Sequence, residues 1–197
     1  MDTDERQFSA GVNPKKENFF QEIFKFSLIA LLIVVPIRFF IAQPFIVSGS
    51  SMEPTFESGE YLIVDQLSYR LEAPERGDVI IFRYPNDPSK FFIKRIIGLP
   101  QESVVINGSQ ISIKNALHPE GFFIEEPYLA SQNLRSDFLE IKLSSAEYFV
   151  LGDNRRASSD SRVWGALPQE LIVGKALLRL FPITHASLLP GDFEESE

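Results

Sequence analysis

The chain has 197 residues, of which 44% are hydrophobic and 23% are charged, which suits one medium domain plus an additional segment and excludes disorder throughout. It contains no cysteine, so disulfide bonds and thiolate metal sites are excluded. The formal net charge is -8, and because phosphate contacts require clustered Lys and Arg, this acidic chain is not expected to bind nucleic acid.

A polar head over residues 1–23 precedes a long apolar run, which predicts a transmembrane anchor over residues 24–42. The uncharged stretch at residues 26–37 is shorter than the roughly 20 residues that a spanning helix needs, so the span must extend past Arg38. Arg38 and Lys25 lie near the two ends of the span, where long basic side chains can reach the membrane interface. We therefore expect a single transmembrane helix.

Basic residues on the two sides of this run indicate its orientation. Lys15, Lys16 and Lys25 lie before its centre and Arg38 alone lies after it, so we expect the N-terminus in the cytosol and the following domain outside it. The alternative is a cleaved signal peptide, which needs small residues at the first and third positions before the cut. Bulky Phe40 occupies the third position. The sequence thus favours a single-pass protein of the cell membrane, in contact with membrane lipid.

The residues after the anchor indicate a mainly β fold. The stretch SVVINGSQISIK alternates apolar and polar residues on both sides of Asn107-Gly108, which predicts a two-residue hairpin. Further runs rich in Ile, Val, Phe and Tyr are bounded by Gly and Pro, as strands joined by turns usually are. These predicted strands are YLIVDQLSY, GDVIIFRYP, FFIKRIIGLP, AEYFVLGD and ELIVGKALLRLFP.

The expected organisation is a β-rich domain interrupted by a small inserted β segment. Residues 115–145 are polar and irregular, which suggests that they belong to an insertion between two halves of a core. The predicted boundaries are a domain at 43–190, with its core at 43–100 and 146–190 and its insert at 101–145, and an acidic tail at 191–197.

Two adjacent serines, Ser50 and Ser51, raise the question of a nucleophile and its base. The chain has no complete GxSxG motif and no SxxK motif. Its two histidines, His118 and His185, lie in polar or near-terminal segments, and a solvated or structural role is expected for both. No histidine cluster or phosphate-binding glycine loop suggests a metal or nucleotide, so no cofactor is expected. A lysine is the remaining candidate for the base.

Lys94 is the lysine that best fits this role. A lysine can deprotonate a serine only when it is neutral, so its pKa must fall by about 3 units from its ordinary value, and burial among apolar side chains can achieve this. In FFIKRIIG, Phe92 and Ile96 share the strand face of Lys94. The alternative is an edge-strand lysine that points to water, since charged residues are rarely fully buried.

A third stretch, GDNRRASSDSRVWG at residues 152–165, collects two aspartates, three arginines and three serines after a predicted strand. As an ordinary loop it would be a solvated polar turn. As part of a site it would supply a hydroxyl that orients a lysine amine and an Asp–Arg pair that fixes the loop.

Together these stretches resemble the type I signal peptidases, the membrane-anchored serine proteases that remove signal peptides. The resemblance covers roughly residues 43–100 and 147–166. It rests on SM-x-PT, on RGDVIIFRYP followed by IKRIIGLP, and on GDNR-x-x-SxDSR-x-WG, in this order. The single anchor and the small insert are similar to the cyanobacterial or Gram-positive form.

Carried over residue by residue, the resemblance implies that Ser51 is the nucleophile and Lys94 the general base. Ser158 matches the serine that hydrogen-bonds the lysine amine, and Asp160 and Arg162 match the pair that holds this loop. The residues that match positions lining the pocket for the small residue before the cut are Met52, Phe92 and Ile93.

The resemblance also implies preproteins with Ala-x-Ala-type signal peptides as substrates, and the secretion machinery as a further partner. One position departs from the enterobacterial pattern, in which a serine two residues before the nucleophile contributes to the oxyanion hole. Here that position is Gly49. Ser48, Ser50, a backbone group or water could then provide the second donor.

Two other functions are compatible with parts of the sequence. One is a self-cleaving Ser–Lys protease of related fold, against which the anchor and the absence of a DNA-binding domain count. The other is a non-catalytic membrane-tethered β-domain that binds a partner, in which Ser51 and Lys94 would be structural. Only the combination of motifs argues against this second alternative.

Overall fold

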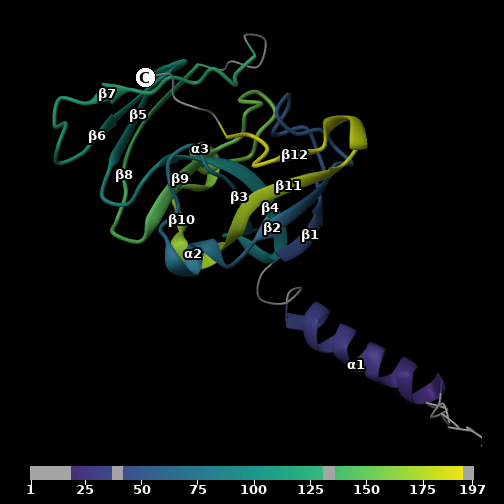
Figure 1. Ribbon diagram of the computed structural model, residues 1–197. Coiled ribbons are helices and arrows are strands. Elements are labelled where there is room, and N and C mark those ends of the chain that lie inside the picture. The colour runs from purple at the N-terminus through teal and green to yellow at the C-terminus, as the bar shows by residue number, and fades with distance from the viewer. Residues whose placement is uncertain (1–18, 37–41, 131–135, 193–197) are drawn as a thin grey trace, which may run out of the picture. The chain divides into compact units, whose positions relative to one another are not determined.

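The computed structural model describes residues 19–36, 42–130 and 136–192 (Figure 1). The chain divides into two compact units, residues 1–37 and residues 38–197. The first unit contributes one described helix, and the second contains all the described strands.

The helix of the first unit is α1 (Phe19–Pro36). Glu22 lies in its first turn, where a negative charge is favourable, and the helix ends at a proline. It begins earlier than the predicted span at 24–42. Of that span, residues 37–41 lie outside the described residues, and residue 42 already belongs to the first strand. Within the described part of the chain, no helix combines the length and the apolar character that a membrane crossing requires.

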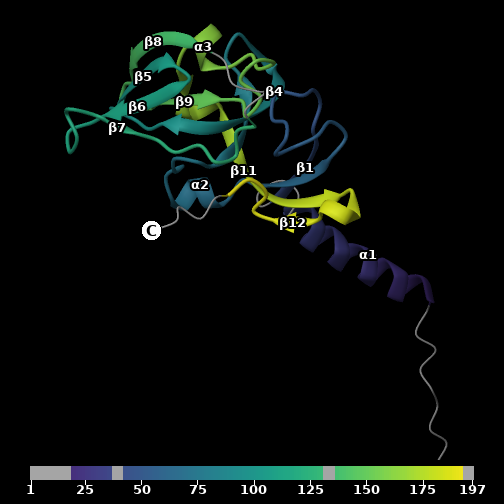
Figure 2. The same cartoon turned by 90° about the horizontal axis from the view of Figure 1, so that it is seen from above.

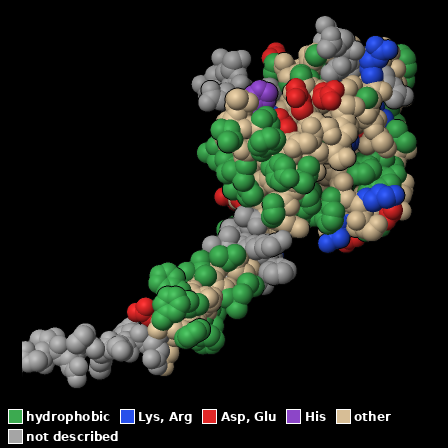
Figure 3. All heavy atoms as spheres, turned by 90° about the vertical axis from the view of Figure 1, so that its right-hand side faces the viewer, with side chains coloured by type: hydrophobic (Ala, Val, Ile, Leu, Met, Phe, Trp, Pro, Cys, Tyr) green, Lys and Arg blue, Asp and Glu red, His purple; other side chains and the backbone are tan. Residues whose placement is uncertain are grey.

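Hydrophobic side chains cover most of the visible surface of α1 (Figure 3). The described side chains of this helix are all exposed, including phenylalanines such as Phe20 at 82% and Phe26 at 79%. A surface of this kind is expected to contact another apolar phase or another protein.

The second unit is built on a large antiparallel sheet, which confirms the predicted mainly β fold. Its strands follow the order β1-β2-β11-β3-β4-β9-β10, and β12 pairs with β11. The strands are β1 (Ala42–Ile46), β2 (Tyr61–Asp65), β3 (Val79–Tyr84), β4 (Asp87–Gly98), β9 (Glu147–Leu151), β10 (Leu167–Pro168), β11 (Ile172–Phe181) and β12 (Ser187–Leu188).

Short helical turns connect some of these strands. The predicted strand YLIVDQLSY is half strand and half helix, because β2 ends at Asp65 and α2 follows. The Asp65 carboxylate accepts hydrogen bonds from the Leu67 and Ser68 N–H groups, which turns the chain out of the sheet. The helical turns are α2 (Ser68–Leu71), α3 (Ser161–Trp164), η3 (Gln169–Leu171) and η4 (Ile183–His185).

A second sheet lies entirely within the predicted insert 101–145, with the order β7-β6-β5-β8. It lies on the side of the unit opposite β1 and β12 in both Figure 1 and Figure 2. The predicted hairpin joins β5 and β6, and because Asn107 faces Gln110, the two turn residues are Gly108 and Ser109 rather than Asn107 and Gly108. Its strands are β5 (Ser103–Gly108), β6 (Gln110–Lys114), β7 (Phe122–Phe123) and β8 (Asp137–Lys142).

The expectation that residues 115–145 are irregular is therefore wrong for β7 and β8. β8 is the edge strand of this sheet and pairs with β5 over its whole length, so its backbone groups on that side are satisfied. Its side chains alternate between half-buried and exposed positions, and none is fully buried. The segment DFLEIK therefore lacks the run of apolar residues by which the other strands were predicted.

Apolar residues of the two sheets form a shared core that fixes the insert to the rest of the unit. Ile97 and Leu151 of the large sheet pack with Val104 and Ile113 of the small sheet, and each is at most 1% exposed. Because close-packed interiors resist deformation, the insert is held rigidly against the ends of β4 and β9.

Candidate active site

Ser51 lies in the turn between β1 and β2, at residues 50–56. Gly49 has φ +93°, a left-handed conformation that favours glycine, and its N–H donates to the Ser58 hydroxyl at 3.3 Å. The Ser51 carbonyl accepts a hydrogen bond from the Asn154 N–H at 3.0 Å. The chain around the hydroxyl is thus fixed both by its own turn and by the loop after β9.

Lys94 lies in β4 and is 3% exposed. Its Nζ is 2.7 Å from the Ser51 Oγ and donates to the Ile93 carbonyl, also at 2.7 Å. The aromatic ring of Phe92 lies beside the amine, with its centroid 5.5 Å away. The serine and the lysine, which are 43 residues apart in the sequence, are therefore within hydrogen-bonding distance.

The electrostatic environment of Lys94 favours the neutral amine. Burial lowers its pKa to about 8, because the charged form loses its hydration, and the nearby carboxylates of Asp160 and Asp153 oppose part of this shift. A substantial fraction of this lysine is therefore neutral near neutral or mildly alkaline pH, and a neutral amine can accept a proton.

The loop at residues 152–162 brings the predicted Asp–Arg pair beside the lysine. Asp160 caps α3, and both of its carboxylate oxygens accept hydrogen bonds from the Arg162 guanidinium at 2.8 Å. Burial by itself raises the pKa of Asp160, but these bonds and the charge of Arg162 hold the pKa below its ordinary value. Asp160 is therefore ionised, and its second oxygen also accepts the Gly152 N–H.

Ser158 lies in the same loop but does not make the expected contact. Its hydroxyl is buried and has no partner in hydrogen-bonding geometry among the described residues, although it helps to lower the pKa of Asp160. The predicted hydrogen bond between Ser158 and Lys94 is not formed in this structure.

A cleft of about 620 Å³ opens onto Ser51 and Lys94. It lies between β1, which is an edge strand, and the first half of β4, which precedes the residues that pair with β9. The apolar side chains that line it are Phe45, Ile46, Val47, Leu62, Ile81, Phe91, Phe92, Ile93 and Ala157. A largely apolar cleft between two strand edges is suited to an extended peptide.

Two of the three predicted pocket residues, Phe92 and Ile93, line this cleft, and Met52 does not. Met52 is 1% exposed and packs in the core with Phe56 and Val64, because its side chain points away from the Ser51 hydroxyl into the sheet. Neither histidine lines the cleft, and both His118 and His185 are exposed.

Charged residues without a predicted role surround the site. Arg95, which is fully buried, donates two hydrogen bonds to Asp153, and Thr55 donates to the same carboxylate at 2.6 Å. The sequence does contain a signal for this pair, because Arg95 lies within the apolar run IKRIIG and a buried arginine requires a charged partner. Within the described ranges, no group of three or more His, Cys, Asp or Glu side chains is arranged to hold a metal ion.

Comparisons with known proteins show which family the chain resembles. The family model described as signal peptidase, peptidase S26, matches residues 20–181. A probable signal peptidase I-2 of Synechocystis sp. is 35% identical over 96% of this chain and 86% of its own length, and a signal peptidase I of Bacillus amyloliquefaciens is 37% identical over 85% and 89%. The crystal structure of a signal peptidase I from Enterococcus faecalis V583 has 31% identity and a TM-score of 0.46, covering 53% of this chain and 97% of that chain.

Proposed function

Because the chain belongs to the signal peptidase family, peptidase S26, and is a serine-type hydrolase that cleaves signal peptides from preproteins, we propose that Ser51 is its nucleophile and Lys94 its general base. The observation that carries this proposal is the 2.7 Å distance between Lys94 Nζ and Ser51 Oγ at the bottom of an apolar cleft. A nucleophile within hydrogen-bonding reach of its base is the arrangement that covalent catalysis requires.

The chemistry proceeds in two steps. Neutral Lys94 accepts the proton of the Ser51 hydroxyl while Oγ forms a bond to the scissile carbonyl carbon, and the resulting oxyanion collapses as the amine leaves with the proton from Lys94. Lys94 then takes a proton from water as the water oxygen attacks the acyl carbon, and it returns this proton to Oγ as the bond to Ser51 breaks, which restores the hydroxyl and the neutral amine. The Ser51 N–H is one oxyanion donor, and the Ser48 and Ser50 hydroxyls are both candidates for the second because both residues line the cleft.

The residues of the loop at 152–162 support this dyad. Asp160 and Arg162 hold the loop through paired hydrogen bonds, which keeps the Asp160 charge near Lys94 at a fixed position. Ser158 orients the lysine amine during turnover, because a buried hydroxyl without a fixed partner gains from a hydrogen bond with the amine.

The cleft selects small residues before the cut. Phe92 and Ile93 form part of an apolar lining next to the reacting atoms, where a small apolar side chain such as that of alanine can be accommodated. The substrate lies extended between β1 and β4, where backbone pairing with the strand edges holds it and the cleft sets Ala-x-Ala-type specificity.

Cleavage is expected to rise with pH through the pKa of Lys94. The base must be neutral, so kcat/KM should fall about tenfold for each pH unit below about 8 and level off above it. The measurement is cleavage of an added preprotein by the full chain in detergent across this range. A preprotein with Phe in place of the Ala before the cut is the control and should stay intact.

A rate that is flat from pH 6 to 9 would contradict the role of Lys94. Cleavage of the chain itself without cleavage of the added preprotein would instead favour the self-cleaving protease. Binding of the preprotein with no cleavage would favour the non-catalytic membrane-tethered domain.

We also propose that the N-terminal unit anchors the enzyme in the cell membrane, with the N-terminus in the cytosol and the β unit outside. The exposed apolar side chains of α1 support this, together with the lysines before it. The full chain should stay in the membrane pellet after alkaline extraction, and protease added outside spheroplasts should digest the β unit. Recovery in the soluble fraction, or protection of the β unit from that protease, would contradict the proposal.

A further inference from the structure

The insert contributes a buried carboxylate to the loop beside the active site. Both oxygens of Glu126 pair with the guanidinium of Arg155, one of them at 3.0 Å from Nη1. The Arg155 side chain is 5% exposed and the Glu126 side chain is 8% exposed. A two-point pair of this kind fixes direction as well as distance, so the insert determines the orientation of the arginine.

Arg155 in turn contacts the backbone that lies against the nucleophile. Its Nε donates to the Gly152 carbonyl at 3.1 Å. Gly152 lies directly against the nucleophile turn, because a Cβ atom added there would be 2.4 Å from the Ser51 carbonyl oxygen and 2.3 Å from the Ser158 hydroxyl. Two residues later, the Asn154 N–H bonds the same Ser51 carbonyl. A shift of Arg155 would therefore move the backbone that holds Ser51.

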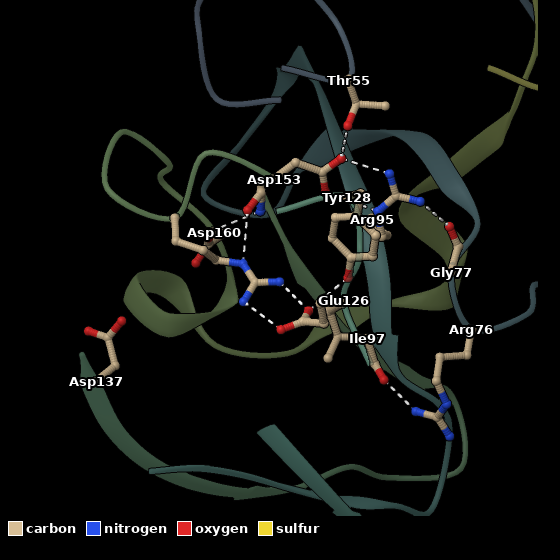
Figure 4. Close-up of polar contacts among 12 residues, drawn as sticks. Thr55, Arg76, Gly77, Arg95, Ile97, Glu126, Tyr128, Asp137, Asp153 and Asp160 are labelled. Atoms are coloured by element: carbon tan, nitrogen blue, oxygen red, sulfur yellow. Dashed lines mark hydrogen bonds and ion pairs between the residues drawn. The ribbon is translucent and has the colours of Figure 1, made fainter. Parts of the chain in front are cut away.

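The same insert segment also contacts the strand that carries Lys94. The Tyr128 hydroxyl donates to Glu126 at 2.7 Å. The guanidinium carbon of Arg95 lies over the Tyr128 ring, 4.0 Å from the ring centroid. Figure 4 shows Tyr128 between Glu126 and Arg95, and Asp153 hydrogen-bonded to the same arginine. Arg95 follows Lys94 directly in β4, so Glu126 and Tyr128 together join the strand of the base to the loop that holds the nucleophile.

A second carboxylate of the insert binds the other end of the loop. Asp137, at the start of β8, accepts a hydrogen bond from Arg162 at 2.7 Å, while Arg162 also donates to the Arg155 carbonyl. Two of the three arginines of the loop, Arg155 and Arg162, are thus each paired with an acid of the insert. Buried ion pairs contribute little net stability compared with apolar packing. We therefore interpret these pairs as contacts that fix the geometry of the loop at residues 152–162.

We propose that the insert positions the active site through Glu126 and Asp137, which hold the loop at residues 152–162 by way of Arg155 and Arg162. This inference rests on the proposed Ser51–Lys94 dyad. Glu126 touches neither substrate nor the reacting atoms, so it is a positioning residue. Its loss should impair the chemical step more than substrate binding, because the cleft between β1 and β4 does not include it.

The test compares Glu126→Gln with Glu125→Gln in the full chain, using preprotein cleavage in detergent. The two variants make the same change at adjacent positions, but Glu125 is exposed. Glu126→Gln should lower kcat by roughly 10- to 100-fold and leave KM within about twofold, since displacement of a reacting group by about 1 Å has effects of this size. Glu125→Gln should match the wild type.

A second readout separates positioning from general loss of stability. Hydrogen exchange in peptides covering residues 152–162 should become faster in Glu126→Gln, while the strands of the large sheet keep the wild-type rate. Arg155→Gln should lower kcat at least as much as Glu126→Gln, because it breaks both the pair with Glu126 and the hydrogen bond from Nε to the Gly152 carbonyl. A uniform increase of exchange, or a kcat equal to that of Glu125→Gln, would overturn the proposal.

If Glu126→Gln does not fold, Glu126→Asp is the deciding variant, because it keeps the charge and shortens the side chain by one methylene. It should lose kcat several-fold with faster exchange confined to the loop, and unchanged kcat would overturn the proposal. Ser51→Ala is run in parallel. Activity retained by Ser51→Ala would refute the dyad itself, whereas an inactive Ser51→Ala beside a fully active Glu126→Gln would refute only the role of the insert.

Discussion

Ser51→Ala is expected to abolish preprotein cleavage, with kcat falling by roughly 10⁴- to 10⁶-fold, as it does when the nucleophile of a serine protease is removed. The alanine removes the only atom that can form the acyl-enzyme in the proposed mechanism. Lys94 would keep its hydrogen bond to the Ile93 carbonyl, so the fold should be retained. Cleavage of a preprotein by the detergent-solubilised full chain, followed over several hours, measures the loss.

Ser50→Ala distinguishes the two adjacent serines. Ser50 lines the cleft, so its loss could remove an oxyanion donor and should cost at most roughly 10²- to 10³-fold. A loss in Ser50→Ala as complete as that in Ser51→Ala would put the nucleophile assignment in doubt. Near-normal turnover of Ser51→Ala would refute it. Ser145→Ala, at an exposed position of the chain, is the matched control for the substitution.

Lys94→Arg is expected to lower kcat by a factor on the order of 10⁴ even though it preserves the positive charge. A guanidinium remains protonated at any pH at which the protein is folded, so it cannot accept the proton of Ser51. It is also larger than the amine and cannot keep both the 2.7 Å contact with Ser51 Oγ and the contact with the Ile93 carbonyl. Single-turnover cleavage of a preprotein reports the chemical step directly.

Raising the pH tests whether an arginine at position 94 can act as the base at all. Lys94→Arg should stay inactive up to pH 10, whereas the wild type should reach its plateau above about pH 8. Lys114→Arg makes the same substitution in β6, where the amine lies 3.7 Å from Glu140 at the surface, and should leave cleavage unchanged. Recovery of Lys94→Arg at alkaline pH would show that the base lies elsewhere.

The sequence predicted most of the large sheet because its strands are runs of β-branched and aromatic residues bounded by Gly and Pro. β3, β4, β9 and β11 all coincide with such runs. β8 was missed because half of its side chains face water and the other half are only partly buried. The described helix α1 covers the predicted span only as far as Pro36, because residues 37–41 lie outside the described residues.

That Ser51 and Lys94 lie close together was implied by the resemblance to signal peptidases. The sequence spacing of the two residues could not predict it, because strand pairing between positions 43 residues apart leaves no periodic pattern in the sequence. The contacts of Glu126 and Asp137 could not have been predicted either. They join the insert to arginines 29 and 25 residues away, and they start from segments without regular patterning. Met52 was assigned to the pocket by its motif position, but the packing of the turn directs its side chain into the core.

Neighbouring side chains of β4 face opposite sides of the sheet, so the proposed activity depends on the register in which this strand pairs. Lys94 reaches Ser51 on one face, while the adjacent Arg95 pairs with Asp153 on the other, and their partners in β3 are Ile80 and Val79. A slip of one residue would send the arginine to the serine and the lysine into the ion pair, because neighbouring side chains exchange faces. A misregistered chain would then lack the proposed pair of serine and lysine and should not cleave preproteins, even if the rest of its sheet were formed.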